Sequence, residues 1–168
     1  LGFDASVAFN MNKFKKWPLI SGKGAYNLGI VYSLLFKMKQ KVVIEVDDEL
    51  VFDGKILLSA IGNGLCCGGA YYCLPKASIE DGLMDAVIVK KLSRFKFIGL
   101  IKKYKSGEYV DIPKYQKYIK YLKCKKIVLK SEKDITYSLD GECGQIKELI
   151  ITIISKCINF VVPKEYTK

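Results

Sequence analysis

The stretch AIGNGLCCGGAYYCLPKASIEDGLMDAVIVKKLSR, Ala60 to Arg94, decides the fold more than any other part of this sequence. It opens at the end of an apolar run, and the glycines that follow break the chain into a loop. Further on, a turn at Gly82 leads from acidic residues into DAVIVK, Asp85 to Lys90, which is typical of a strand. The order predicted here is strand, glycine-rich loop, acidic turn and strand.

Outward from this stretch, short segments rich in Val, Ile and Tyr recur about every 10 residues in the C-terminal half. That spacing is typical of an antiparallel sandwich or closed sheet. Apolar spacing predicts helices over Lys23–Lys39 and Arg94–Tyr104. The second helix is expected to carry Phe95, Ile98, Leu100 and Ile101 on one side. The segments interpreted as strands are Phe3–Phe9, Val42–Val46, Lys55–Ile61, Asp85–Lys90, Tyr115–Tyr121, Lys125–Lys130, Ile135–Leu139, Leu149–Ile154 and Cys157–Val162.

Length and composition indicate one α+β domain dominated by strands. The chain has 168 residues, of which half are hydrophobic, and it contains no histidine. The lack of histidine excludes Ser-His-Asp and Cys-His catalysis and any His-ligated zinc or haem within these residues. The longest apolar run, Leu28 to Phe36, is far shorter than a membrane span. The chain begins at Leu1 without an initiator Met, so we expect it to be a fragment of a longer protein.

The charge is strongly positive, with 28 Lys+Arg against 17 Asp+Glu and a formal net charge of +11. Arg94 is the only arginine, and sequence-specific base readers rely on arginine. The composition therefore favours nonspecific attraction to nucleotide phosphates or an anionic bilayer over sequence-specific nucleic-acid binding. The alternative is that the lysines only keep the surface soluble.

The six cysteines show no metal-ligand spacing and no C-x-x-C pair. Most stand in apolar or β-like surroundings, which indicates reduced cysteines that pack in a cytoplasmic protein. A disulfide framework is not expected.

Three motifs could carry chemistry. Asn63-Gly64, followed by Gly68-Gly69, would let backbone approach a ligand, although a bulged hairpin explains the same glycines. Glu80, Asp81 and Asp85 surround a glycine turn and could hold a hard cation, or could form an acidic surface turn.

The third motif is Ser138-Leu139-Asp140-Gly141-Glu142, at the end of a predicted strand. Asp-Gly is a common hairpin turn, so a structural role is one interpretation. The other is chemical, because carboxylates placed two residues apart could supply a general base and a ligand for a metal or hydroxyl.

In this order and spacing, the three motifs resemble the C-terminal domain of the bacterial diacylglycerol kinase and lipid kinase family. That family is related to sphingosine and ceramide kinases and, more distantly, to NAD kinases. The resemblance begins at GFDASVAFNMN (Gly2 to Asn12) and continues through KGAYNLG (Lys23 to Gly29). It includes Ala60 to Arg94 and LDGE (Leu139 to Glu142), and it closes at Val162-Pro163.

The resemblance implies an α+β, β-rich, antiparallel β-sandwich-like C-terminal domain of the NAD kinase/diacylglycerol kinase fold with a few helices, over residues 1–168. It also implies an N-terminal nucleotide-binding domain with a Gly-Gly-Asp-Gly-Thr loop. This sequence has no such loop. We therefore expect the N-terminal half to be absent from this chain, and the isolated fragment to be inactive.

Site residues also follow from the resemblance. Glu142 matches the carboxylate that accepts the proton of the lipid hydroxyl, and Asp140 matches its catalytic partner. Asp81 matches a metal-binding aspartate, whose site the carbonyls of Ser78 and Leu83 complete. The residues that match the loop facing the interdomain cleft and the nucleotide are Asn63, Gly64, Gly68 and Gly69; many relatives have a third glycine where this chain has Ala70.

The resemblance implies a cytoplasmic, peripherally membrane-associated enzyme that transfers the ATP γ-phosphate to diacylglycerol with Mg²⁺. Pairing of exposed sheet edges would give a homodimer. One alternative is a kinase of the same fold that acts on a sphingoid lipid or NAD. Another is a non-catalytic basic module that binds polyanions or membranes, for which the carboxylate motifs would have no role.

Overall fold

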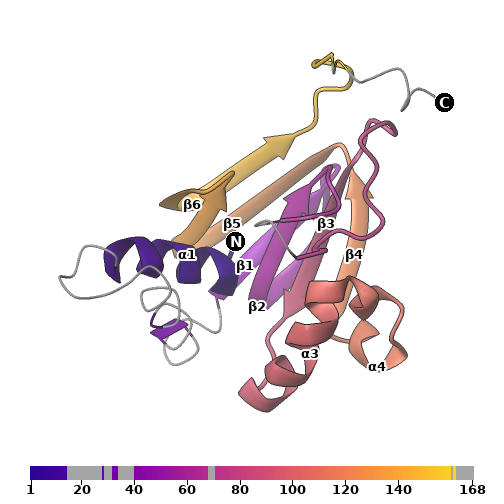
Figure 1. Cartoon of the computed structure of the whole chain (residues 1–168). Coiled ribbons are helices and arrows are strands. Elements are labelled where there is room, and N and C mark those ends of the chain that lie inside the picture. Colours follow the sequence, from indigo (N-terminus) through magenta and orange to yellow (C-terminus); the bar gives the residue numbers. More distant parts are fainter. Residues whose placement is uncertain (15–27, 29–31, 34–39, 68–70, 160, 162–168) are drawn as a thin grey trace.

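A computed structural model of the chain describes residues 1–14, 28, 32–33, 40–67, 71–159 and 161. Its centre is one six-stranded antiparallel sheet with the strand order β4-β3-β2-β1-β5-β6 (Figure 1). The strands are β1 (Gln40–Val46), β2 (Glu49–Gly62), β3 (Met84–Lys90), β4 (Ile119–Cys124), β5 (Lys126–Leu139) and β6 (Glu142–Thr152).

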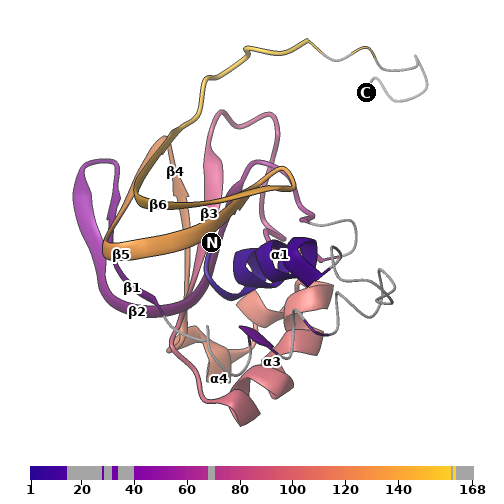
Figure 2. The same cartoon turned by 90° about the vertical axis from the view of Figure 1, so that its left-hand side faces the viewer.

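The sheet curls back on itself. A single residue, Lys125, joins β4 at one edge of the sheet to β5 near the other edge. The long β2 strand pairs with β1 along its first half and with β3 along its second half, and it bends between the two (Figure 2). Across the curl, the Nζ of Lys120 on β4 donates to the carbonyl of Val51 on β2 at 2.9 Å. The predicted β-sandwich-like arrangement is confirmed.

Side chains of β3 are buried on both faces of the sheet, which is why DAVIVK is a nearly continuous apolar run. Val87 and Val89 face the helices, whereas Ala86 and Ile88 face the inside of the curl. The core therefore has two parts, one between sheet and helices and one between the two halves of the sheet.

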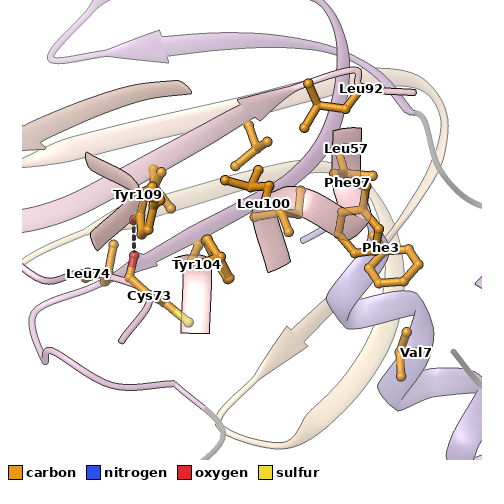
Figure 3. Close-up of a cluster of buried hydrophobic side chains, with 14 residues drawn as sticks. Phe3, Val7, Leu57, Cys73, Leu74, Leu92, Phe97, Leu100, Tyr104 and Tyr109 are labelled. Atoms are coloured by element: carbon orange, nitrogen blue, oxygen red, sulfur yellow. Dashed lines mark hydrogen bonds between the residues drawn. The ribbon is translucent and has the colours of Figure 1, made fainter. Parts of the chain in front are cut away.

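Helices cover one side of the sheet. They are α1 (Phe3–Phe14), α3 (Arg94–Ser106), the 3₁₀ turn η1 (Glu108–Val110) and α4 (Pro113–Gln116). Figure 3 shows Phe3 of α1 against Phe97 of α3, with ring centroids 4.8 Å apart. In the same cluster the buried Tyr109 hydroxyl donates to the carbonyl of Cys73, and burial raises the pKa of this phenol. This bond ties the loop after β2 to the helices.

The strand interpretation of Phe3–Phe9 is wrong, because these residues begin α1. The buried positions Phe3 and Val7 are four residues apart, and Ser6 and Asn10 repeat that spacing, which fits one helix face and not an alternating strand. Gly2 starts the helix with a positive φ of 89°, and its carbonyl accepts the N–H of Ser6 at 2.9 Å. The apolar run was too short to distinguish the two periods.

Two other strand interpretations are wrong in part. The segment Tyr115–Tyr121 begins in α4, because Pro113 starts a helical turn, and only its end enters β4. The described residues of Cys157–Val162 form no strand, since they follow a turn at Lys156 with a positive φ and lie exposed. Apart from Lys125, which joins β4 to β5, the predicted strands Lys125–Lys130 and Ile135–Leu139 fall in one strand, β5, with an irregularity between Lys130 and Ile135.

The predicted helix Arg94–Tyr104 is confirmed as α3. The Ser93 hydroxyl accepts the N–H of Lys96 at its start, and Gly107 ends it in the left-handed conformation. Its predicted apolar face is wrong in part: Leu100 is buried and Ile101 packs against the core as predicted, but Phe95 and Ile98 are exposed, and Phe97 and Tyr104 are buried in their place.

The predicted helix Lys23–Lys39 lies almost entirely outside the described residues; of its members, Leu28, Tyr32 and Ser33 are described and are helical. Within the described part of the chain, no helix combines the length and the apolar character that crossing a bilayer requires.

Candidate functional site

Asp140, Gly141 and Glu142 form the tip of the hairpin between β5 and β6. Leu139 and Glu142 are the last paired residues, so Asp140 and Gly141 make a two-residue turn. Both have positive φ, 46° and 96°, as the hairpin turn that suits twisted strands requires. The hairpin interpretation of Asp-Gly is confirmed, and it leaves the chemical interpretation open.

The two carboxylates at this tip are exposed. Within the described part of the chain, the carboxylates of Asp140 and Glu142 make no hydrogen bond and no ion pair. Helix α1 packs along β5 and β6 beside this hairpin (Figure 1). The turn therefore presents two charged groups that are available to a ligand.

Asn63 and Gly64 follow the end of β2 and form a bend, as expected for a loop that leaves a strand. A Cβ atom built on Gly64 would meet nothing within 4 Å, so space is open on that side of the backbone. The other glycines predicted for this loop, Gly68 and Gly69, lie outside the described residues.

The acidic turn is built around Asp81. One carboxylate oxygen, Oδ1, accepts the N–H of Leu83 at 3.0 Å, and this bond closes the turn over Gly82, whose φ is positive at 70°. The Ser78 hydroxyl accepts the N–H of Glu80 at 3.3 Å in the same loop. The D-G-L sequence thus has a local structural reason: an aspartate acceptor and a residue that tolerates the left-handed region.

Lys123, which the sequence analysis did not identify, forms ion pairs with the carboxylates of this turn. Its Nζ lies 2.5 Å from Oδ2 of Asp81 and 3.5 Å from Oδ2 of Asp85, whose side chain is fully buried. Asp85 and Lys123 are register partners on β3 and β4. The hydrogen bond from Lys123 lowers the pKa of Asp81 and raises the pKa of Lys123. Only the strand register could have shown this partnership.

The arrangement does not suit a divalent metal at Asp81 while Lys123 is in place. Both carboxylate oxygens of Asp81 are engaged, one by a backbone N–H and one by an ammonium group. Among the described residues, no three His, Cys, Asp or Glu side chains gather as metal ligands. The metal site at Asp81, with the carbonyls of Ser78 and Leu83, stays a prediction that requires Lys123 to move.

The acidic turn and the Asp140–Glu142 hairpin lie at opposite ends of β5. Lys123 stands just before the start of β5, and Asp140 follows its last residue, Leu139. An extended strand of 14 residues spans roughly 45 Å at about 3.3 Å per residue. The structure therefore does not bring Asp81 and Glu142 together, and it indicates separate roles for the two motifs.

The Lys123–Asp81 pair predicts a pH dependence of stability at both extremes. Because the pKa of Asp81 is lowered, its contribution is complete above 3.8, the ordinary value, and is lost as the pH falls through the folded-state value. Because the pKa of Lys123 is raised, its contribution is complete below 10.5, the ordinary value, and is lost as the pH rises through the folded-state value. Thermal unfolding across this range should give a plateau that falls at both ends.

The control is Lys123→Met, which leaves the buried Asp85 without its cation. We expect its melting temperature at neutral pH to fall by roughly 5–10 °C, because a buried charge without a partner is costly. Asp85→Asn in the same background should restore most of that loss. An unchanged melting temperature in Lys123→Met would contradict the role given to this pair.

Solved structures with this fold come from bacterial diacylglycerol kinases. A crystal structure of a diacylglycerol kinase from Bacillus anthracis str. Sterne superposes with a TM-score of 0.52 at 24% identity, over 74% of this chain and 43% of that chain. The curled antiparallel sheet is thus the β-sandwich-like fold found in that class of protein.

The sequence comparisons show the family. The chain belongs to the family described as the YegS C-terminal NAD kinase beta sandwich-like domain, which matches residues 1–162. It is 29% identical over 143 residues to "Probable lipid kinase YegS-like" of Shewanella frigidimarina, covering 84% of this chain and 44% of the relative. It is 28% identical over 150 residues to the diacylglycerol kinase of Bacillus subtilis, covering 89% and 48%. The chain therefore spans less than half the length of these relatives.

Proposed function

We propose that this chain is the C-terminal domain of a lipid kinase that transfers the γ-phosphate of ATP to diacylglycerol, giving phosphatidic acid. The names of the relatives, diacylglycerol kinase and YegS-like lipid kinase, support the class of reaction. The observation that carries the proposal is the hairpin tip at Asp140-Gly141-Glu142, where two exposed carboxylates, neither of them bonded to another described residue, lie two positions apart in the chain.

In the proposed reaction, Glu142 accepts the proton of the lipid hydroxyl while that oxygen attacks the γ-phosphorus. One oxygen–phosphorus bond forms, the bond between the γ-phosphorus and the bridging oxygen breaks, and ADP leaves. Asp140 assists by orienting the hydroxyl. Bound together with ATP, Mg²⁺ compensates the phosphate charge. In the proposed complex, the bound nucleotide faces the backbone of Asn63, Gly64, Gly68 and Gly69.

Asp81 has no part in the proposed proton or phosphoryl transfer. Because it lies at the other end of β5, a cation there would act on the turn and not on the reacting groups. The proposed enzyme works in the cytoplasm and visits an anionic membrane, where its substrate is found. The net charge of +11 supports that attraction. A homodimer through exposed sheet edges stays a prediction.

The test is transfer of labelled γ-phosphate from ATP to diacylglycerol by the full-length protein, with and without Mg²⁺. We expect phosphatidic acid to form only with Mg²⁺, and the isolated 168-residue chain to give none. Sphingosine and NAD serve as competing acceptors in parallel reactions. Transfer to either of these and not to diacylglycerol would overturn the assigned substrate, and the absence of ATP binding would overturn the kinase assignment.

A further inference from the structure

The outer face of α3 combines exposed apolar side chains with a surplus of positive charge. Phe95 is 88% exposed and Ile98 is 61% exposed. With Lys102 they follow the i, i+3, i+7 spacing that places side chains on one side of a helix. The buried residues Phe97, Leu100 and Tyr104 occupy the opposite side. The "α3 outer face" is defined here as the exposed α3 residues Phe95, Ile98, Lys102 and Lys105 together with the exposed Lys91, which lies in the segment just before the helix.

The fold does not require this apolar exposure. Helix α3 is already held in place by two aromatic contacts. Phe97 packs against Phe3, and the ring centroids of Tyr104 and Tyr109 are 5.0 Å apart. Phe95 and Ile98 contribute nothing comparable to the core, because most of their surface is in water. Because Phe95 and Ile98 are neighbours on one side of α3, they form a joint apolar patch, and an exposed apolar patch rimmed by charged residues points to an interaction partner.

The surroundings of the two apolar side chains are basic. Residues 90–107 contain seven Lys and Arg and no Asp or Glu. The first carboxylate after them, Glu108, is ion-paired with Lys103. Within the described residues, no carboxylate pairs with Lys91, Lys102 or Lys105. Lys105 lies 5.7 Å from the centre of the Tyr71 ring, a contact that leaves its charge in place, so all three lysines can attract an anionic surface.

Tyrosines border the same face on the side of α4. The Tyr115 hydroxyl donates to the carbonyl of Gly99 at 3.0 Å, so α4 lies against α3 (Figure 1). The Nζ of Lys96 donates to the Tyr118 hydroxyl at 2.7 Å, and that of Lys117 lies 5.2 Å from the centre of the same ring. Tyrosine rings with lysines beside them are typical of residues at a membrane–water interface.

We propose that the α3 outer face is a membrane-docking surface, which inserts Phe95 and Ile98 among the headgroups of an anionic bilayer. Lys91, Lys102 and Lys105 then contact lipid phosphates. Two apolar side chains make a patch far smaller than a stable protein interface needs, and lysine is depleted at the centre of such interfaces. Charge complementarity therefore favours an anionic lipid surface over a protein partner.

The docking surface is connected to the hairpin that carries Glu142. Phe97 on the inner side of α3 contacts Phe3 of α1, and α1 packs along β5 and β6. A membrane bound by α3 would thus contact the same packed domain that carries the hairpin. This inference rests on the proposed function for the reason to visit a bilayer, but its test does not depend on turnover.

The experiment measures sedimentation of the full-length protein with vesicles of phosphatidylcholine containing about a third phosphatidylglycerol. We expect Phe95→Ser/Ile98→Ser to weaken binding at least 10-fold, and Lys91→Gln/Lys102→Gln/Lys105→Gln to weaken it similarly and reduce its salt dependence. Phe95→Trp should retain binding. The matched control is Leu50→Ser, another apolar side chain, 66% exposed, at the start of β2, which should bind as the wild type does.

Melting temperatures of the variants test whether another part of the full-length protein, and not a membrane, covers the α3 outer face. If Phe95→Ser/Ile98→Ser lowers the melting temperature and leaves vesicle binding intact, the face is covered by another part of the full-length protein and the proposal is overturned. Transfer to diacylglycerol in detergent micelles separates the two proposals. If both variants lose vesicle binding while the wild type shows no turnover, the docking surface is supported and the kinase function is rejected. If the wild type shows normal turnover while both variants bind vesicles as the wild type does, the kinase function is supported and the docking surface is rejected.

Discussion

Glu142→Gln in the full-length protein is expected to lower the rate of phosphoryl transfer to diacylglycerol by roughly 10²–10⁴-fold, the usual contribution of a positioned general base. Glutamine keeps the size of the side chain and removes its ability to accept a proton. The measurement is the single-turnover rate at saturating ATP and diacylglycerol, so that a change in binding is not mistaken for a change in chemistry.

The fold should tolerate this substitution. Glu142 is exposed at the hairpin tip, and the turn geometry depends on Asp140 and Gly141. The melting temperature of Glu142→Gln should therefore equal that of the wild type. Glu148→Gln, an exposed carboxylate on the same strand, is the matched control and should keep full activity. Wild-type rates in Glu142→Gln would reject Glu142 as the proton acceptor.

Gly2→Ala is expected to cause the largest loss of stability among single methyl additions to the described glycines. A Cβ atom on Gly2 would lie 2.5 Å from the carbonyl oxygen and 2.9 Å from the Cα of the β2 residues Leu57 and Leu58, respectively. Both are backbone atoms, which cannot rotate away. The φ of 89° adds strain of about 1–3 kcal/mol for a residue with a side chain.

The contacts of Gly2 explain why this position is sensitive. Its N–H donates to the carbonyl of Thr136 on β5, and the N–H of Ser59 on β2 donates to the carbonyl of Leu1. The start of the chain therefore joins β2 to β5. Chemical denaturation should show a loss of more than about 2 kcal/mol for Gly2→Ala.

Gly64→Ala is the comparison for this experiment. Because no atom lies within 4 Å of its built Cβ and its φ is not positive, we expect a change within about 0.5 kcal/mol. Equal stabilities of the Gly2 and Gly64 variants would show that the β2 backbone yields at Leu57.

Local patterns were predictable from sequence where the chain contacts only its neighbours. The hairpin at Asp140-Gly141 depends on residues that tolerate positive φ, and it forms as predicted; the turn at Asp47-Asp48 has the same local cause. The helix over Arg94–Ser106 has its cap residues beside it in the sequence, Ser93 and Gly107. The family resemblance added the β-sandwich-like fold, which no single segment indicates.

Short apolar runs were ambiguous because burial, not propensity, decided their conformation. Phe3–Phe9 could have been a strand, but Gly2 hydrogen-bonds to β5 and bridges to β2, and from there a helix buries Phe3 and Val7 together. In α3, apolar residues extend well beyond one face of the helix. Contact with α1 selected the side with Phe97 and Leu100, and left Phe95 in water.

The sequence by itself determined the class of fold, the hairpin carboxylates Asp140 and Glu142, and the glycine turn at Asp81, because each depends on adjacent residues or on a motif read in order. Only the tertiary structure decided that Lys123 pairs with Asp81 and Asp85, since the register of β3 and β4 places Lys123 opposite Asp85 and within reach of the turn that carries Asp81. It also placed the acidic turn and the hairpin at opposite ends of β5 and gave α3 its exposed apolar face. These are properties of packing between distant segments, and no local pattern encodes them.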